Sequence, residues 1–412
     1  MIGTGAGRAA AARLEKTVDG SAIRHNVEVL RKAGGGRRIM AVVKGNAYGL
    51  GALAISRVLL AAGADALAVD TVAEGIELRE YGVAGPVIVM DTDVAENAAA
   101  CVSHRLTPAV ASLAQIRWHA AAARGHRTAV WLRTNIGFNR FGPRDEEGFD
   151  AVLAGLADAS GTLRAAGIFA HLSSAAADSA ETAAQARLFR SRAEKARQVF
   201  GTSCHTSLAA THGLIHAEAL TGTDWIRPGL GLYGLVDPGS RQLPGWPHSG
   251  LDDLRPAITV RARVLDVVTA LDGVGDGVGY DRTVRLSPGT RLASVAIGFA
   301  RGLAGAGPRL TGMLHGIRCP AVGRPGMDCT TFDVTAVPMA SPGDWMTFID
   351  ESSPGADHLV KSAAETAAEL GLSIYELLAT FRMPVRLTDS ATAEPIAEQT
   401  PEPTAEKWST RA

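Results

Sequence analysis

Short apolar runs of β character alternate with longer stretches of helical period from residue 38 to about residue 236. The apolar runs cover 39–44, 66–69, 86–90, 107–111, 129–134, 165–172, 203–208 and 224–230, and amphipathic stretches such as 54–64 and 181–200 fit between them. Because strands that alternate with helices build parallel βαβ units, we expect a parallel sheet. Eight units are typical of a (β/α)8 TIM barrel, although an open doubly wound sheet shows the same alternation.

This alternation stops after residue 236. Residues 237–250 are rich in proline, glycine and polar side chains, which is typical of a linker. Alternating β-branched runs then predict a mainly β domain, followed by two short helices. We therefore divide the chain into a flexible N-terminus (1–15), a barrel (16–245), a mainly β domain (246–387) and a tail (388–412). The tail is rich in Pro, Thr, Ala and Glu, and this composition predicts disorder.

Charge and cysteine content narrow the class of protein. The formal net charge is -1, from 41 basic and 42 acidic residues, so the totals give no sign of a nucleic-acid partner. No apolar run reaches the roughly 18 residues of a membrane helix, and the N-terminal segment lacks the apolar centre of a signal peptide. The four cysteines match no zinc or redox spacing. We expect a cytoplasmic protein that binds neither nucleic acid nor a membrane.

Two predicted strand ends carry candidate functional residues. Lys44 closes the first apolar run and is followed by a glycine, and catalytic groups of barrels lie at such carboxyl ends. A partly desolvated amine there is a candidate Schiff-base nucleophile, whereas the alternative is a lysine that extends into water. Arg227 and the Pro-Gly after it close the eighth run, where barrels bind phosphate on backbone N–H groups. Arg227 itself contacts a planar ligand or pairs with a carboxylate.

Five motifs resemble those of the alanine racemase family. VVKGNAYGLG (42–51) resembles the family's pyridoxal 5'-phosphate (PLP) attachment motif AVVKANAYGHG, and IRPGLGLYG (226–234) resembles RPGIALYG. The others are GVGYDRTV (277–284), GRPGMD (323–328) with FDVTAV (332–337), and SIYELLATFRMPVR (373–386). All five occur in the family's order within residues 17–386. The chain is therefore identified from its sequence as a member of this family.

The resemblance implies a PLP-bearing barrel, a β domain and a head-to-tail homodimer that acts on a small amino acid. Lys44 would hold PLP as a Schiff base and serve as one base, and Tyr280 of the other subunit would be the base on the opposite face. Racemisation needs two such bases because a proton leaves one face of Cα and returns on the other. An ordinary tyrosine ionises only near pH ~10, so Tyr280 needs cationic or donor neighbours.

The resemblance also assigns the remaining contacts of the site. The phosphate would be held by Tyr48, Tyr375 and the backbone N–H groups of Gly229 and Leu230, with Ser207 as a substitute for the family's phosphate-binding serine. Arg227 would face the pyridine nitrogen with His205 behind it, His171 would polarise Tyr280, and Arg140 and the Met327 backbone N–H would bind the substrate carboxylate. Since arginine keeps its proton, Arg227 would leave the ring nitrogen unprotonated and restrain side reactions.

Several positions depart from the family pattern. Arg133 stands where the family has a lysine that is often carbamylated, and it brings like charge toward Arg140, which a bound anion or Asn135 would have to compensate. Phe299 and Arg301 replace a tyrosine and an acidic residue near the pocket entrance. Both proposed bases persist, so we expect proton-transfer chemistry, on alanine or on a shifted substrate. The alternatives are another PLP reaction such as decarboxylation, and a PLP-binding protein without turnover.

Overall fold

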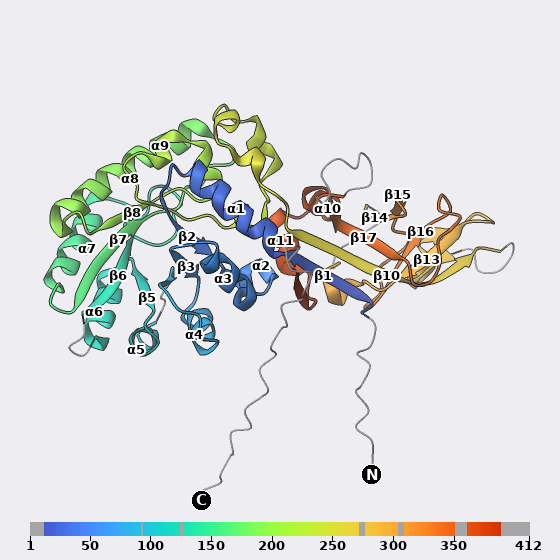
Figure 1. Ribbon diagram of the computed structural model, residues 1–412, viewed down its shortest axis with the longest axis horizontal. Helices are drawn as coiled ribbons and strands as arrows, with labels where there is room; N and C mark the ends of the chain where they lie inside the picture. The colour runs from blue at the N-terminus through green and yellow to red at the C-terminus, as the bar shows by residue number, and fades with distance from the viewer. Residues whose placement is uncertain are drawn as a thin grey trace, which may run out of the picture.

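The computed structural model describes residues 12–91, 94–123, 127–271, 277–303, 309–350 and 361–388. The chain forms a barrel and an elongated β domain beside it (Figure 1). Apart from residues 12–15 and Thr388, the predicted flexible N-terminus and tail lie outside the described residues. Among the described helices, none has both the length and the apolarity to cross a bilayer.

Eight parallel strands close the barrel in chain order, which confirms the TIM barrel and rules out the open sheet. They are β2 (Arg38–Val42), β3 (Ala66–Val69), β4 (Val87–Val89), β5 (Thr107–Val110), β6 (Thr128–Arg133), β7 (Leu163–Phe169), β8 (His205–Ser207) and β9 (Trp225–Ile226). The ring closes where Arg38 of β2 pairs with Trp225 of β9. Each strand overlaps one of the eight predicted runs.

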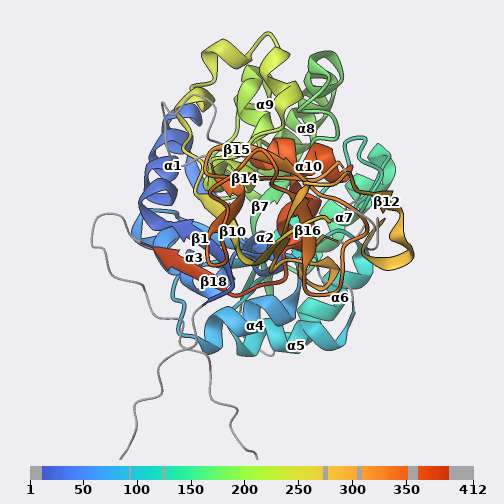
Figure 2. The ribbon, with the colours of Figure 1, turned by 90° about the vertical axis from the view of Figure 1, so that its right-hand side faces the viewer.

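The barrel strands bury both faces. Met40 and Val42 pack inside the barrel with Trp131 and Trp225, whereas Ile39 and Ala41 belong to the core beneath the helices. This two-residue alternation is the period of a strand. The helices form a ring around the barrel, as Figure 2 shows. They are α1 (Gly20–Ala33), α3 (Ala52–Ala61), α4 (Val72–Glu80), α5 (Glu96–Ser103), α6 (Leu113–Ala122), α7 (Glu146–Asp158), α8 (Ser179–Phe200) and α9 (Ala217–Leu220).

The predicted linker and the residues just after it form a run of short 3-10 turns, whose Trp246 and Leu251 belong to the main hydrophobic core. These turns are η3 (Pro238–Gln242), η4 (Trp246–His248) and η5 (Leu251–Asp253). Trp246 is buried, and its indole Nε1 donates to the Asp252 carboxylate at 3.0 Å. The connection between the two domains is therefore packed against the barrel.

The second domain is mainly β, as predicted. Its main sheet has the order β15-β14-β17-β10-β1-β18, and β13 pairs with both β10 and β16. Its elements are β10 (Ile258–Thr269), β11 (Gly277–Val278), β12 (Val284–Arg285), β13 (Arg291–Val295), β14 (Thr311–Leu314), β15 (Ile317–Pro320), β16 (Thr330–Asp333), β17 (Trp345–Asp350), β18 (Val385–Thr388), α10 (Ala363–Leu370) and α11 (Ile374–Thr380).

The first strand of the chain, β1 (Leu14–Asp19), lies in this second sheet. It runs antiparallel to β10 and parallel to β18. The division made from the sequence assigned these residues to the flexible N-terminus and the barrel. The two ends of the described chain are therefore paired in the β domain, where Figure 2 labels β1 and β18 beside each other.

Lys16 on β1 connects the two domains. It is only 2% exposed, and its amino group donates to the carbonyls of Gly49 at 2.6 Å and Phe381 at 2.7 Å. Burial lowers the pKa of Lys16 to about 8. Gly49 ends the turn that begins at Lys44, and Phe381 follows α11. One side chain therefore ties the β sheet to the loop and the helix that border the barrel mouth.

Candidate active site

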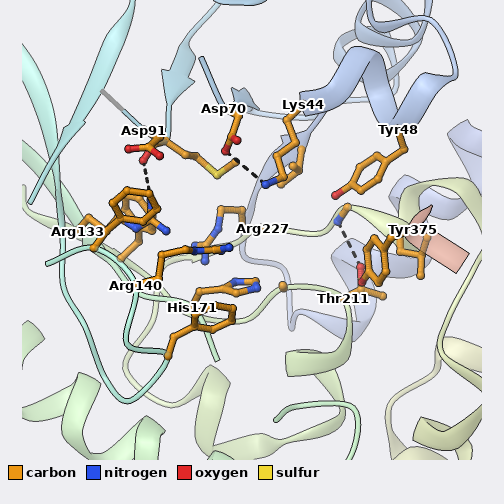
Figure 3. A pocket seen from close by; sticks show the side chains of 18 residues that line it. Lys44, Tyr48, Asp70, Asp91, Arg133, Arg140, His171, Thr211, Arg227 and Tyr375 are labelled. Carbon is orange, nitrogen blue, oxygen red and sulfur yellow. Dashed lines mark hydrogen bonds and ion pairs between the residues drawn. The ribbon is translucent and has the colours of Figure 1, made fainter. Parts of the chain in front are cut away.

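A cavity of about 610 Å³ opens at the carboxyl ends of the barrel strands. Side chains from the ends of different strands converge on it, as Figure 3 shows. Lys44, Asp70 and Asp91 follow β2, β3 and β4, and His171 and Arg227 follow β7 and β9. The strand ends therefore gather cations and carboxylates in one place, where barrels carry out their chemistry.

Lys44 opens an unusual turn, α2 (Lys44–Gly49). Gly45, Asn46, Ala47 and Tyr48 all have left-handed backbone angles, with φ of 61°, 53°, 52° and 59°. Each non-glycine residue in that region costs roughly 1–2 kcal/mol, so the turn stores strain beside the pocket. The result is that both Lys44 and Tyr48 line the cavity. The Lys44 Nζ lies 3.3 Å from the Asp70 carboxylate.

Hydroxyl groups gather on the side of the cavity near Tyr48, where the sequence predicted a phosphate, and this side is called the predicted anion site. The Tyr48 and Tyr375 rings lie 6.0 Å apart, and burial raises the pKa of both, that of Tyr375 to about 12. Their hydroxyls therefore remain donors at neutral pH. A Cβ on Gly229 would lie 2.1 Å from the Tyr48 hydroxyl, so only glycine fits there. Gly229 and Leu230 both line the cavity, as the sequence predicted.

The hydroxyl at this predicted anion site belongs to Thr211 rather than Ser207. Thr211 lines the cavity, and its Oγ1 accepts from the backbone N–H groups of Gly229 at 3.3 Å and Gly231 at 3.0 Å. Ser207 is fully buried and lies outside the cavity lining. Sequence reasoning missed Thr211, which follows two alanines and lies four residues beyond the Ser207 that it chose.

Arg227 is buried beneath the cavity and is held from both sides. Its guanidinium donates to the Ala170 carbonyl at 2.6 Å and to the Ser207 hydroxyl at 2.9 Å. Burial and the charge of Arg133 lower the pKa of Arg227 to about 9, so it stays charged at neutral pH. This is the place predicted for a contact with a pyridine nitrogen.

The structure does not place His205 behind Arg227. Ser207 stands there instead, and His205 lines a different cavity at the other end of the barrel. The reason is depth along β8. Residues two apart on a strand share a face but lie about 6.6 Å apart along it. The side chain of His205 therefore lies on the same face of β8 as that of Ser207 but nearer to the amino-terminal end of the barrel.

Arg140 and His171 face the cavity together. The Arg140 guanidinium lies 4.4 Å from the centre of the Phe138 ring, and His171 lies against the same ring at 5.4 Å. In the described part of the chain, Arg140 has no carboxylate partner, so it is available to an anionic ligand. Burial within the cavity and the charges of Arg227 and Arg140 lower the pKa of His171 to about 3. His171 is therefore a neutral imidazole at physiological pH.

Two carboxylates that sequence reasoning missed face Arg133. Burial and Arg140 lower the pKa of Arg133, whereas Asp91 and Asp70 raise it. Its guanidinium donates to the Met90 carbonyl at 3.1 Å. Asn135, which the sequence offered as a group to compensate the charge of Arg133, instead accepts from the backbone N–H groups of its own loop. The ends of β3 and β4 therefore supply the negative charge that balances this departure from the family pattern.

Tyr280 and Met327 lie on the β domain and outside this cavity. Tyr280 begins the turn η6 (Tyr280–Arg282) and is 70% exposed, and Met327 is 58% exposed. Phe299, in η7 (Phe299–Arg301), is also exposed, and its backbone N–H donates to the Gly326 carbonyl at 3.0 Å. The structure therefore brings the barrel residues together but leaves the predicted second base on a separate surface.

A barrel that presents a lysine, an anion-binding turn and a buried arginine at one mouth defines a class of enzymes that hold a planar, phosphorylated cofactor. The family model for the alanine racemase N-terminal domain matches residues 18–237, and that for the C-terminal domain matches residues 257–388. The chain belongs to the alanine racemase family.

Individual relatives agree with this assignment. An alanine racemase from Thioalkalivibrio sulfidiphilus is 34% identical over 90% of this chain and 96% of its own length, and one from Sorangium cellulosum is 32% identical over 86% and 93%. The crystal structure of alanine racemase from D-cycloserine-producing Streptomyces lavendulae has a TM-score of 0.83 at 26% identity, covering 92% of this chain and 98% of that one. The biosynthetic alanine racemase from Pseudomonas aeruginosa has a TM-score of 0.78 at 27% identity, covering 92% of this chain and 100% of that one.

Proposed function

We propose that this protein is a PLP-dependent racemase that interconverts L- and D-alanine. The observation that carries the proposal is the convergence of Lys44, the Gly229–Leu230 turn and Arg227 on one cavity. The proposed substrate rests on the names of the relatives, and the proposed reaction rests on the residues that line the cavity. A volume of about 610 Å³ is within the usual size of pockets for small molecules.

The residues of the cavity fit PLP. The hydroxyls of Tyr48, Tyr375 and Thr211 and the Leu230 backbone N–H suit a phosphate. The Gly229 N–H already donates to Thr211, and the missing side chain at position 229 leaves the phosphate room. Arg227, which stays charged, suits an unprotonated pyridine nitrogen. Lys44 would hold the cofactor covalently through Nζ. When bound, PLP supplies an electron sink for the charge left on Cα after a proton departs.

Lys44 would move the proton on one face of Cα. Its side chain lines the cavity, and its amino group lies 3.3 Å from the Asp70 carboxylate. Arg140, which has no carboxylate partner among the described residues, would bind the substrate carboxylate. Asp91 and Asp70 would keep Arg133 engaged, so that two neighbouring guanidinium groups do not repel one another.

The second base would come from a second copy of the chain. Tyr280 is exposed on the β domain and lies outside the cavity of its own barrel, and the surface of this domain also exposes Phe299 and Met327. A homodimer in which this surface covers the partner's barrel mouth would place Tyr280 on the opposite face of Cα. The Met327 backbone N–H would then join Arg140 at the substrate carboxylate.

Proton exchange in D₂O tests the proposed function. The PLP-loaded protein should incorporate deuterium at Cα of L-alanine and produce D-alanine. A panel of other amino acids should be run in parallel, because Arg133 and Asp70 alter the charge of the pocket. Failure to exchange the α-proton of any amino acid would overturn the proposal. Release of CO₂ without racemisation would favour a decarboxylase on the same fold.

The thiols agree with a reducing environment. All four cysteines are free, and three of them are buried. We therefore expect the enzyme to work in the cytoplasm, where thiols stay reduced.

A further inference from the structure

A second cavity lies at the opposite end of the barrel. Its volume is about 270 Å³, and it shares no lining residue with the catalytic cavity. Thr107, Ala129, Arg164, His205 and Trp225 line it, and each lies at or next to the first residue of its strand. This cavity therefore opens at the amino-terminal mouth, away from the chemistry proposed above.

Two tryptophans form the apolar wall of this cavity. The Trp131 and Trp225 rings meet edge to face, with centroids 6.0 Å apart and an interplanar angle of 89°. The other apolar lining residues are Pro86, Ile88, Ala129 and Ala166. The indole Nε1 of Trp225 is buried and has no hydrogen-bond partner among the described residues. A buried donor without a partner is uncommon in native proteins.

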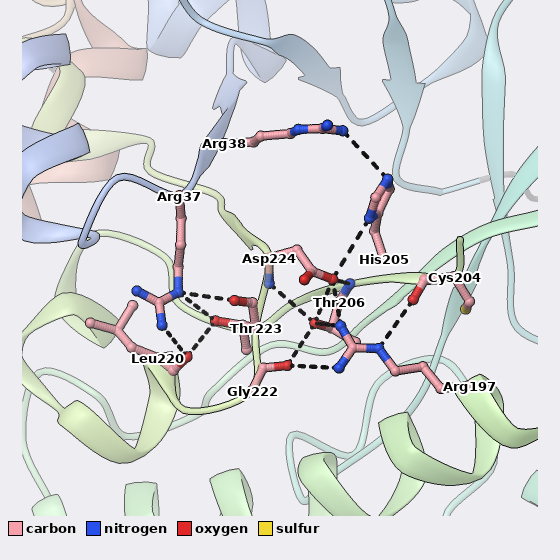
Figure 4. Close-up of polar contacts among 10 residues, drawn as sticks. All are labelled: Arg37, Arg38, Arg197, Cys204, His205, Thr206, Leu220, Gly222, Thr223 and Asp224. Carbon is pink, nitrogen blue, oxygen red and sulfur yellow. Dashed lines mark hydrogen bonds and ion pairs between the residues drawn. The ribbon is translucent and has the colours of Figure 1, made fainter. Parts of the chain in front are cut away.

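Two arginines border the same cavity, and neither forms an ion pair with a carboxylate in the part of the chain that the structure describes. The Arg38 guanidinium lies 5.5 Å from the centre of the Trp225 ring, and its Nη1 lies 3.4 Å from His205 Nε2 (Figure 4). Arg164, on the lining itself, makes no ion pair or hydrogen bond within the described residues. An arginine in such a place is ready to bind a planar anion through paired N–H groups.

The carboxylate that faces His205 is already engaged. Asp224 accepts from the Arg197 guanidinium at 2.6 Å and from the Thr206 backbone N–H at 2.9 Å, as Figure 4 shows. It lies 3.7 Å from His205 Nδ1. Burial lowers the pKa of His205, so its ring is neutral at physiological pH and its Nε2 can accept from Arg38. This end of the barrel therefore offers positive charge and little to receive an ammonium group.

We propose that the amino-terminal mouth of the barrel binds a small organic carboxylate with an apolar or aromatic body. The carboxylate would pair with Arg164 and Arg38, and the body would lie against Trp131 and Trp225. A free amino acid fits less well, because its ammonium group would meet cations. This site is separate from the catalytic cavity and does not depend on the proposed reaction.

Benzoate is a suitable probe, used with the full-length, PLP-loaded protein and followed by calorimetry and tryptophan fluorescence. We expect saturable binding with a dissociation constant of about 1 mM or tighter. Arg164→Gln should weaken it at least tenfold, and Trp225→Phe should weaken it and reduce the fluorescence change. Arg187→Gln, on the exposed face of α8, is the matched control and should bind as the unchanged protein does. Arg164 is exposed, so its substitution should leave folding intact, which a melting curve checks.

Further measurements separate this site from the catalytic cavity. Benzylamine, which has the ring but carries a cation, should not bind. Arg140→Gln should leave benzoate binding unchanged. Loss of binding in Arg140→Gln but not in Arg164→Gln would overturn the proposal, as would the absence of saturable binding. Inorganic phosphate that competes as well as benzoate would refute the assignment of an apolar body to the ligand.

Discussion

The carboxyl mouth of the barrel and the Tyr280 surface of the β domain carry the two halves of the proposed chemistry, yet they differ in completeness. At the mouth, Lys44 and Arg227 lie within one cavity and already have protein partners. On the β domain, Tyr280 is 70% exposed and lies outside that cavity. The contrast supports the proposal that one chain would hold the cofactor and that a second copy would supply Tyr280.

Removal of Lys44 should have the largest effect, because both the covalent hold on the cofactor and one base disappear. Lys44→Ala should lower the racemisation rate by about 10⁴-fold or more and abolish the visible absorbance of the covalently held cofactor. Lys32→Ala, at an exposed position of α1, is the control and should retain both. A visible absorbance that survives in Lys44→Ala would show that another amine holds PLP.

Tyr280→Phe should have the second largest effect. It should lower the racemisation rate by about 10²–10⁴-fold and change cofactor binding little. Loss of one base should leave α-proton exchange from one enantiomer while conversion to the other fails. Deuterium incorporation, measured separately from L- and D-alanine, distinguishes these steps. Equal and undiminished conversion in both directions would remove Tyr280 from the mechanism.

Mixing these two variants tests the comparison directly. In a dimer with shared sites, one Lys44→Ala chain and one Tyr280→Phe chain regenerate a single intact site. Random pairing then restores about a quarter of the original sites. If the mixture stays inactive while mixed dimers are shown to form, each site uses both residues of one chain.

Thr211→Ala should weaken cofactor binding by about tenfold. The substitution removes a hydroxyl that lines the cavity as a donor to the phosphate, and a hydrogen bond to a charged group contributes about 1.5 kcal/mol or more. It also removes the acceptor that fixes the N–H groups of Gly229 and Gly231. The PLP dissociation constant, measured by equilibrium dialysis, reports the effect. Ser207→Ala is the paired variant. It should remove a hydrogen bond from the Arg227 guanidinium and leave the affinity for the phosphate unchanged. A larger loss of cofactor affinity in Ser207→Ala would reverse this assignment.

Lys16 should produce a smaller effect that depends on pH. Its pKa is lowered from 10.5 in the unfolded chain to about 8 in the folded protein. Between these values the unfolded state holds one more proton, so the free energy of unfolding rises with pH. Relative to Lys16→Met, the native protein should gain stability as the pH rises from about 8 to 10.5 and lose the same amount as the pH falls back to about 8, with no further change below that pH. Denaturant unfolding at several pH values measures the difference, and parallel pH profiles would contradict it.

The amino-acid sequence was sufficient for much of the fold. Each barrel strand overlaps a predicted apolar run, because a two-residue or helical period is a local property of the chain. The partner of β1 was not predictable in this way. Its pairing with β10 and β18 joins segments more than 200 residues apart, and no local pattern selects a partner at that separation.

The candidate site likewise has residues that local motifs identified and residues that only the tertiary structure placed there. Motifs by themselves identified Lys44, Tyr48, Arg140, His171, Arg227, Gly229, Leu230 and Tyr375, all of which line the cavity. Only the tertiary structure decided that Thr211 reaches the predicted anion site, that His205 faces the opposite mouth, and that Asp70 and Asp91 balance Arg133. The sequence determines residue type and strand face, whereas depth along the barrel and the neighbours across it depend on how all eight strands pack.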